Sequence, residues 1–380
     1  MQSNAGSGRI FFLQALRGAA AVIVMVYHLA LKFWTTHDAL AVSFPWMAGE
    51  LHDAAFWLEG IGAACARMNL DLGCFGVALF FLISGFVISL SLEKQNSVSF
   101  LVARVFRIYP LYLVGLALTM LSIFAFTQYL GLEYSYTIVD YLKQGSLLGD
   151  WFWLPSIDGI VWTLEVELKF YLLICVIHAM RRLNSARALL ATAAGMCLFN
   201  ILVSNRYGLL LQTSIIRYRI VYILAMSFVY LIYMFIGVCF YNFYKKYWDL
   251  KKTIVAVVSL YLLYIAALLN GVDTGINNIY LTSYTLALLL FAGCHAMQER
   301  IRYNRLFQFF GDISYPLYVV HGVNGYILMS VLDMVGVDPY VSVAVTMGLS
   351  ILLAYVLHRL VELPSNMFGK KVAKKIGKIG

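Results

Sequence analysis

Arg17 and His28 lie in one apolar segment, LQALRGAAAVIVMVYHLALKFW, that is long enough to cross a bilayer. An arginine and a titratable imidazole are costly in lipid, so both are candidates for a functional role. Their spacing of eleven residues is almost three whole helical turns, which puts both side chains on one face, about 16 Å apart along the axis. We therefore expect both to face the protein interior, where arginine can bind an anion and histidine can transfer a proton.

A second pair of cations, Arg104 and Arg107, occurs in the sequence ARVFRIYP, just before a long apolar run. Side chains three residues apart share a helix face, and two planar guanidinium groups suit the phosphates of a nucleotide-bearing donor. Arginines at the end of a membrane helix are also ordinary anchors at the cytoplasmic surface. Taken alone, the pair favours the anchor.

Two glutamates, Glu165 and Glu167, occur in VWTLEVELKFYLL. Residues two apart on a helix point in nearly opposite directions, so these carboxylates cannot act together on one ligand. We expect one of them to face the interior that His28 reaches, since an unpaired glutamate in an apolar span is a functional candidate. The other interpretation is a structural ion pair between Glu165 and Lys169, four residues further on.

Ser314, Tyr318 and His321 fall on one helical stripe in the sequence GDISYPLYVVHG. Such a stripe can line a cavity, but serine and tyrosine also make ordinary hydrogen bonds between membrane helices. His321 taken alone favours a packing role. Trp162 belongs to a group of six tryptophans on or near the expected outer side, where flat rings form an interfacial belt or stack on sugar rings.

These residues belong to a strongly apolar chain of 380 residues, 62% hydrophobic and 12% charged, with a mean hydropathy of +0.80. Soluble domains carry roughly 25% charged residues, so the composition excludes that class and predicts an all-α, polytopic integral membrane protein. Ten apolar runs approach the roughly 20 residues of a spanning helix. They cover residues 10–31, 73–91, 108–130, 160–179, 187–204, 220–240, 253–269, 279–296, 313–333 and 341–361.

We expect a single membrane domain over residues 1–380, because no hydrophilic stretch is long enough to bury its own core. The long polar connections, residues 32–72 and 131–159, are expected on the outer side, with a basic tail at about 366–380. The distribution of lysine and arginine predicts that both termini are cytoplasmic. The net charge of +9 then reflects topology and attraction to membrane lipid, and the sequence predicts no nucleic-acid partner.

The six cysteines form no metal-binding pattern, so we expect no metal cofactor. Four of them lie in expected helices, where a small apolar packing role is the default. Cys65 and Cys74 lie in or beside the first outer connection. Either a disulfide in an oxidising compartment or two free thiols would fit that position.

The motifs occur in a fixed order along the chain. They are R-x10-H at Arg17 and His28, GVALFFLISGF at 76–86, R-x-x-R at Arg104 and Arg107, W-[ST]-L-x-V-E from Trp162 to Glu167, SYPLYVVH ending at His321, and VELPS at 361–365. Together they resemble the integral-membrane acyltransferase 3 family, bacterial enzymes that O-acylate carbohydrates. The resemblance covers nearly the whole chain.

The resemblance implies roles for particular residues. In this family the first-helix arginine and histidine are essential, and the R-x-x-R pair is associated with the acyl-coenzyme A donor. The functional glutamate of the fourth helix corresponds to Glu167. Two departures concern the acceptor: Ala78 replaces the acidic residue common in GVDLFF, and Leu168 and Lys169 replace the usual Glu-Gln. The resemblance also implies a form without the fused extracytoplasmic esterase-like domain of some relatives.

On the donor side, the resemblance and the expected topology suggest how the substrate binds. We expect the phosphates of a cytoplasmic acyl-coenzyme A, taken to be acetyl-coenzyme A, at Arg104 and Arg107 with help from Arg17. Ser314 and His321 are assigned to the same donor site. The pantetheine arm would then thread between the helices towards the outer side.

On the outer side, the thioester would meet His28, acting as a general base on a sugar hydroxyl or as a covalent acyl carrier. Glu167 is expected at a similar depth, where it would orient or charge-balance the imidazole. Trp162 and Tyr318 are assigned to the acceptor, a carbohydrate such as a surface polysaccharide, the O-antigen of lipopolysaccharide or a lipid-linked glycan. We expect the protein in the bacterial inner membrane, as a multi-pass O-acetyltransferase.

Two other classes of membrane protein use intramembrane polar residues. A secondary transporter would be expected to show internal repeats and paired broken helices, and the sequence has no clear repeat. A subunit of a polysaccharide-export complex would use the same charges structurally. The sequence leaves open the acceptor sugar, the acyl group and the oligomeric state.

Overall fold

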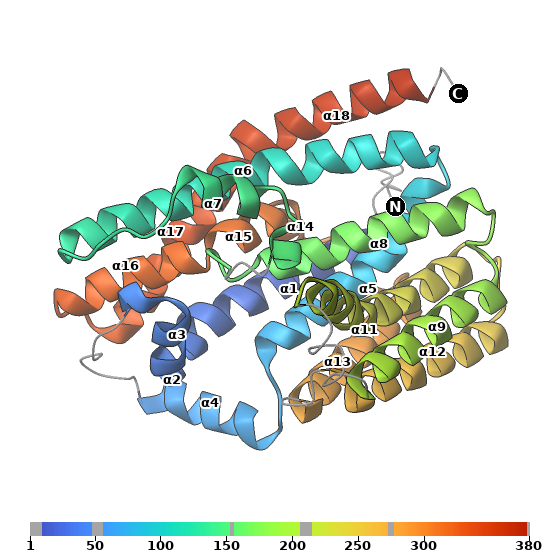
Figure 1. Cartoon of the computed structure of the whole chain (residues 1–380), viewed down its shortest axis with the longest axis horizontal. Helices are drawn as coiled ribbons and strands as arrows, with labels where there is room; N and C mark the ends of the chain where they lie inside the picture. Colours follow the sequence, from blue (N-terminus) through green and yellow to red (C-terminus); the bar gives the residue numbers. More distant parts are fainter. Residues whose placement is uncertain (1–9, 48–55, 153–155, 206–214, 273–276, 378–380) are drawn as a thin grey trace.

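The structure is a computed structural model that describes residues 10–47, 56–152, 156–205, 215–272 and 277–377. All regular structure within these ranges is helical, as the composition predicts. Figure 1 shows long helices packed side by side. They are α1 (Phe11–Val26), α5 (Leu72–Leu92), α6 (Ser97–Tyr129), α8 (Val161–Ala179), α9 (Ala186–Asn205), α11 (Ile215–Tyr244), α12 (Leu250–Asn270), α13 (Asn277–Ala296), α17 (Pro339–Leu357) and α18 (Leu363–Ile376).

Each of the ten predicted spans coincides with a helix. In the described part of the chain, eight helices are long and apolar enough to cross a membrane, and the bent pair α15 (Ser314–Val320) and α16 (Val323–Met334) makes a ninth. The remaining predicted span, residues 160–179, coincides with α8, which is 19 residues long, carries Glu165, Glu167 and Lys169, and is not among these helices. Because charge is costly in lipid, these groups need partners, which are Ser84 of α5 for Glu167 and Asp150 of the preceding connection for Glu165 and Lys169.

The two ends of the described chain lie on the same side of the bundle. Ile10, just before α1, and Gly377, just after α18, line one common cavity, and Figure 1 shows α18 ending beside the start of α6. The ten spans predicted from the sequence would place the two ends on one side in this way. Which side is cytoplasmic stays a prediction from the distribution of lysine and arginine.

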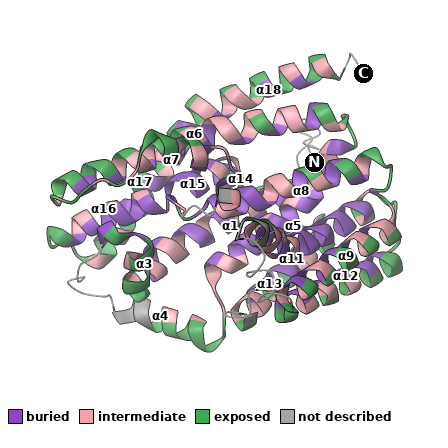
Figure 2. Ribbon diagram, viewed as in Figure 1, coloured by how far each residue is buried: buried purple, intermediate pink, exposed green. Residues whose placement is uncertain are grey.

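The core of the bundle is built around α5 and α11. The helix α5 packs against α1, α8, α11 and α13, and α11 also packs against α9 and α12. Figure 2 shows buried residues concentrated along these inner helices, with exposed residues on the outer faces of the bundle. Large apolar side chains on those outer faces, such as Leu121, Leu262 and Leu289, are exposed. Such side chains are suited to contact lipid.

The two long connections contain short helices. The first holds α2 (Phe33–Thr35), α3 (His37–Ser43), the 3-10 turn η2 (Pro45–Met47) and α4 (Phe56–Arg67), and the second holds α7 (Ile138–Gly145) and the 3-10 turn η3 (Gly149–Phe152). Before α15, a further short helix, α14 (Arg305–Asp312), packs against α1. Cys65 and Cys74 are both free thiols, so the disulfide alternative is not realised.

The backbone departs from regular α-helix at three places along the spans. A π-helix, η1 (Tyr27–Lys32), continues α1 and contains His28. The chain bends by 55° between α15 and α16, where His321 and Gly322 connect the two helices. A second π-helix, η4 (His358–Glu362), joins α17 to α18. Such irregular turns are frequent at functional sites, and each of these carries a histidine.

Close backbone contact between α5 and α11 depends on two glycines. A Cβ atom added to Gly237 would lie 2.2 Å from the carbonyl oxygen of Leu82, and one added to Gly85 would lie 2.1 Å from that of Met234. Small residues let membrane helices approach this closely. Such close packing matters in lipid, because apolar burial alone does not hold helices together there. The position of α5, which carries several residues of the site described below, therefore depends on this crossing.

Replacement of Gly237 by alanine is expected to separate α5 from α11. The added methyl group overlaps backbone, so we expect a destabilisation of about 1–3 kcal/mol, seen as a lower melting temperature of the purified protein in detergent. Gly293→Ala is the matched control, because a Cβ there meets no atom within 4 Å. An equal loss in both variants would contradict the proposed importance of the crossing.

Candidate active site

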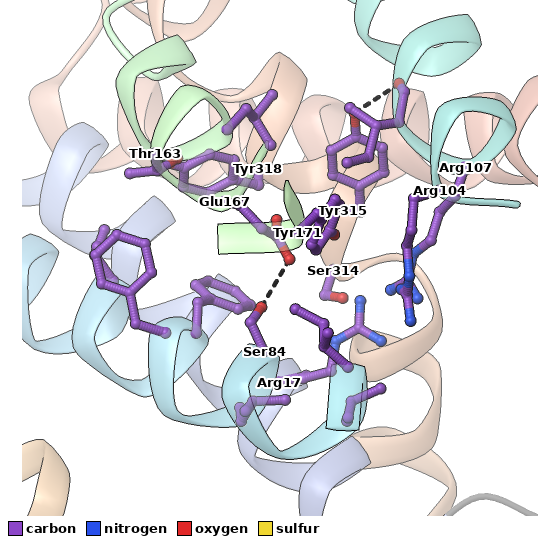
Figure 3. A pocket seen from close by; sticks show the side chains of 18 residues that line it. Arg17, Ser84, Arg104, Arg107, Thr163, Glu167, Tyr171, Ser314, Tyr315 and Tyr318 are labelled. Atoms are coloured by element: carbon purple, nitrogen blue, oxygen red, sulfur yellow. Dashed lines mark hydrogen bonds between the residues drawn. The ribbon is translucent and has the colours of Figure 1, made fainter. Parts of the chain in front are cut away.

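Three arginines gather at one end of a small cavity of about 100 Å³. Arg17 comes from α1 and Arg104 and Arg107 from α6, so residues distant in the sequence meet here. Figure 3 shows their guanidinium groups close together, with Thr163 and Tyr318 at the other end of the cavity. The arrangement concentrates positive charge inside the bundle, as an anion-binding site requires.

Arg104 is held firmly by its neighbours. Its Nη2 donates a hydrogen bond of 2.9 Å to Ser91 Oγ. Its guanidinium carbon lies 4.9 Å from the centre of the Phe100 ring and 5.6 Å from that of Tyr171, and the residue is only 8% exposed. Aromatic faces stabilise a desolvated cation, and a planar group fixed in this way is prepared to bind a ligand without further ordering.

A second, larger cavity of about 990 Å³ opens on the far side of the arginines. Arg17, Arg104 and Arg107 line both cavities and so stand at the junction between them. The larger cavity is bounded by α1, α5, α6, η4 and α18, and Lys94, Lys370 and Lys374 also line it. It is large enough for a cofactor-sized molecule, and its charged lining suits an anionic one.

Glu167 lies with the arginines and lines their small cavity. Its Oε1 accepts a hydrogen bond of 2.8 Å from Ser84 Oγ on α5, and Figure 3 shows its carboxylate directed towards Ser84. This differs from the expectation that Glu167 would orient His28. The reason is that α8 packs against α5, α6 and α11, and equal depth along two helices does not say which helices lie side by side.

His28 instead meets His321. The Nδ1 atom of His28 and the Nε2 atom of His321 are 2.8 Å apart, and the two rings are stacked with their centres 5.0 Å apart. The Nδ1 atom of His321 lies 2.8 Å from the carbonyl oxygen of Leu317. Arg17 of α1 shares the small cavity with Ser314 of α15. Arg17 and His28 therefore both lie against the segment 314–321.

The hydrogen bonds fix the tautomers when both rings are neutral. A carbonyl oxygen only accepts, so the Nδ1 of His321 carries a proton and donates it to Leu317. The Nε2 of His321 is then an acceptor, and the Nδ1–H of His28 donates to it. This leaves the Nε2 atom of His28 with its lone pair, which is the arrangement that a general base or a nucleophile needs.

Tyr318 connects the small cavity to the histidine pair. It lines the cavity, and its hydroxyl lies 2.8 Å from Thr163 Oγ1. The centre of its ring is 6.0 Å from that of His321. The polar side chains therefore continue from the arginines past Glu167 and Tyr318 to His28 and His321.

An aromatic ring of α16 contacts the histidine pair, and rings of the connection between α1 and α5 pack on it. Tyr326 of α16 lies 6.2 Å from His28 between ring centres, in an edge-to-face contact. Phe33 of α2 stacks on Tyr326 at 5.9 Å, and Phe44 contacts the same ring at 6.4 Å. His28 is itself only partly buried. The imidazole thus sits beneath an aromatic loop at the end of the bundle opposite the large cavity.

The other two candidate residues on α8, Glu165 and Trp162, do not line the small cavity. Glu165 accepts a hydrogen bond of 3.1 Å from the backbone N–H of Asp150 in η3, while the Asp150 carboxylate pairs with Lys169. Lys169 therefore forms its ion pair with Asp150, and not with Glu165 as one interpretation of the sequence suggested. Trp162 packs against Phe81 and Tyr230, with ring centres at 6.3 and 5.3 Å.

Asp158 fixes the start of α8 from the second outer connection. Its Oδ1 accepts hydrogen bonds from the backbone N–H groups of Ile160 and Val161 at 3.0 and 3.1 Å. Burial raises the pKa of this carboxyl above its ordinary value, although these hydrogen bonds act in the opposite direction. The loop also approaches the bend of the ninth span, since a Cβ on Gly322 would lie 3.5 Å from the Asp158 carbonyl oxygen.

Sequence reasoning missed several residues of the two cavities. Tyr171 and Tyr315 line the small cavity, and Glu362 lines the large one, where its Oε2 lies 2.6 Å from His358 Nδ1. A signal for the last pair was present, because a histidine and a glutamate four residues apart share a helix face in an apolar segment. The tyrosines carried no comparable signal among the many aromatic residues of the chain.

Comparison with known protein families identifies the chain. A family model described as an acyltransferase domain, that of acyltransferase 3, matches residues 10–359. The chain belongs to the acyltransferase 3 family. It is therefore a membrane acyltransferase, as its motifs predicted.

Two relatives illustrate how far the similarity to individual proteins extends. The chain is 30% identical over 138 residues to "Nodulation protein 10" of Rhizobium leguminosarum bv. viciae, an alignment that covers 32% of this chain and 38% of that protein. It is 28% identical over 255 residues to "Putative acetyltransferase ORF330" of Acidianus two-tailed virus, covering 66% of this chain and 72% of that one. No solved structure matches.

The fixed position of Arg104 predicts unequal effects of lysine substitution in this acyltransferase. In Arg104→Lys the planar contact with two rings is lost, and we expect a loss of stability of about 1–2 kcal/mol, measured by thermal unfolding in detergent. Arg107→Lys, a change at a more exposed residue of the same helix face, is the matched control and should cost less. Equal losses would show that the aromatic contacts do not stabilise the cation.

Proposed function

We propose that the protein transfers an acyl group, taken to be acetyl, from cytoplasmic acyl-coenzyme A to a hydroxyl group of a cell-envelope or exported carbohydrate. The observation that carries this proposal is the series of polar side chains that leads from the large cavity, along the small one to Tyr318, and from there to His321 and His28. The cavity has the size and charge for a nucleotide-bearing thioester. The chain would act in the bacterial inner membrane, with the large cavity on the cytoplasmic side.

The donor binds with its phosphates at Arg17, Arg104 and Arg107. Arginine suits phosphate because its donors match the oxygen atoms in pairs, and Arg104 is already ordered by Ser91 and two rings. The thin pantetheine arm then passes Glu167 and Tyr318 through the small cavity. The side chains there offer both hydroxyl groups and apolar surface, which an amide-containing chain requires.

At the outer end, His28 acts as the general base. The acceptor oxygen attacks the thioester carbonyl carbon while its proton passes to Nε2 of His28. The carbon–sulfur bond breaks, the ester forms, and the proton leaves with the thiolate as coenzyme A thiol. His321 is a positioning residue, because its hydrogen bond holds the proton of His28 on Nδ1. Attack by the same Nε2 atom would form the alternative covalent acyl-histidine.

The carbohydrate acceptor enters beneath the aromatic loop. Tyr326 contacts His28 there, Phe33 and Phe44 pack on Tyr326, and these rings offer flat apolar faces to a sugar ring. Trp162 packs against Phe81 of α5 and Tyr230 of α11, so Phe33, Phe44 and Tyr326 fit the role of acceptor contact better. The relative named as an acetyltransferase supports acetyl as the transferred group.

Purified protein in lipid vesicles, supplied with acetyl-coenzyme A labelled in the acetyl group, tests the function. We expect release of coenzyme A thiol, detected with a thiol reagent, and label in an added bacterial lipopolysaccharide or surface-polysaccharide fraction. Thiol release without the fraction would report slow transfer to water. Uptake of an unmodified solute with no thiol release would instead support a transporter.

The histidine pair makes a sharper prediction. His28→Ala is expected to reduce the rate at least about a hundredfold, since general base catalysis contributes that much or more. His321→Leu removes the acceptor of the Nδ1 proton and should also slow transfer, whereas His321→Gln keeps an acceptor oxygen and should retain more activity. The measurement is kcat/KM against pH, with thermal unfolding as a check on folding. If the leucine and glutamine variants lose activity equally and keep the wild-type pH profile, His321 does not position His28.

A further inference from the structure

The helix α18 lies beyond the part of the chain that matches the family, which ends at residue 359. It nevertheless forms one wall of the large cavity, with lining residues at Leu363, Asn366, Lys370, Ala373 and Lys374. This wall is packed tightly on α6. A Cβ on Gly369 would lie 2.4 Å from Phe106 Cβ, and one on Gly377 would lie 3.1 Å from Ser99 Oγ.

These two contacts fix the direction of α18. As its residue number rises from 369 to 377, its neighbour on α6 changes from Phe106 to Ser99, so the two helices are antiparallel. The end of α18 therefore lies beside the N-terminus of α6, as Figure 1 shows. Lys374, which lines the cavity three residues before Gly377, therefore lies nearer to Ser99 than to Arg107 along α6.

The N-terminal end of α6 lines the same cavity with groups that suit an anion. Lys94, Gln95 and Asn96 line it just before the helix, and a helix N-terminus favours negative charge. Ser99 also lines it, and its Oγ is buried without a hydrogen-bond partner among the described residues. A buried hydroxyl group of this kind is costly unless a ligand satisfies it.

We propose that this end of the cavity, formed by Lys94, Ser99 and Lys374, is a second phosphate-binding subsite, distinct from the one at Arg104 and Arg107. Ser99 and Arg107 are eight residues apart on α6, which corresponds to about 12 Å along the helix. A ligand that occupies both subsites carries two separate anionic groups. The inference rests on the proposed use of acyl-coenzyme A.

The chemistry of coenzyme A fits two subsites in one orientation. Its diphosphate lies between the adenosine and the pantetheine arm, and a further phosphate is attached to the ribose. The arm must enter the small cavity, so the diphosphate belongs at the arginines that stand at the junction. The ribose phosphate then lies on the far side of the diphosphate, at the lysines and the α6 N-terminus.

The test compares acetyl-coenzyme A with its 3′-dephospho analogue, which lacks only the ribose phosphate. For the wild-type protein, kcat/KM should fall about tenfold or more with the analogue, the loss expected for charge-assisted hydrogen bonds to one phosphate. The variant Lys374→Ala should lose most of this factor with acetyl-coenzyme A and much less with the analogue. Binding of coenzyme A and dephospho-coenzyme A, measured by calorimetry, should show the same pattern without depending on turnover.

The control is Lys375→Ala. It removes the same charge from the same helix, and Lys375 does not belong to the cavity lining. This variant should still discriminate between the two donors as the wild type does. Ser99→Ala should weaken discrimination to a smaller extent, because it removes one neutral donor.

The outcomes separate this inference from the proposed function. Turnover of both donors with equal efficiency by the wild type would overturn the second subsite and leave the acyltransferase function standing. Equal losses in the two lysine variants would assign the effect to general surface charge and overturn it too. If the wild type neither binds coenzyme A nor turns over acetyl-coenzyme A, the proposed function fails, and the subsite fails with it.

Discussion

The structure of the site depends on the cost of burying charged and polar side chains in an apolar bundle of helices. Several of these groups meet this cost with a partner from a different element. Arg104 of α6 binds Ser91 of α5, Glu167 of α8 accepts from Ser84 of α5, and His28 of η1 pairs with His321. The helices that satisfy these groups are therefore held in one arrangement by them, so the polar contacts that form the site also align the helices around it.

This arrangement separates two chemical environments along α1. Arg17 stands at the junction of the two cavities, and His28 lies beneath the aromatic loop, about 16 Å further along the helix axis. A large, charged, accessible cavity suits recognition of a highly charged ligand. A small, partly closed passage admits only a thin segment of it. A histidine beyond the passage would be kept away from bulk water on the donor side, which limits the loss of the acyl group to hydrolysis.

Helical periodicity predicted which side chains share a face of one helix. Which side chains of different helices meet was decided by tertiary packing. Spacing alone placed Arg17 and His28 on one face, and it kept Glu165 and Glu167 apart. It could not place Glu167 with the arginines, because spacing along one helix does not say which helices lie side by side. It also could not bring His321 to His28 across nearly 300 residues of sequence. Lys169 pairs with Asp150 of a loop, a contact that no helical spacing rule contains.

The three irregular stretches of backbone explain why the histidines occupy their positions. In a regular helix each side chain is turned by about 100° from the last, so the direction of one residue fixes that of the next. The π-turn at His28 and the bend at His321 break this relation locally, and the imidazoles can meet while the flanking apolar residues keep their packing. The carbonyl oxygen of Leu317 accepts from both the backbone N–H and the Nδ1 of His321. At η4, Glu362 and His358, four residues apart, pair where the last span passes into α18. Irregular turns of this kind are stable only when tertiary contacts support them, so the aromatic loop over His28 and the packing of α18 on α6 are conditions for the site as well as parts of the fold.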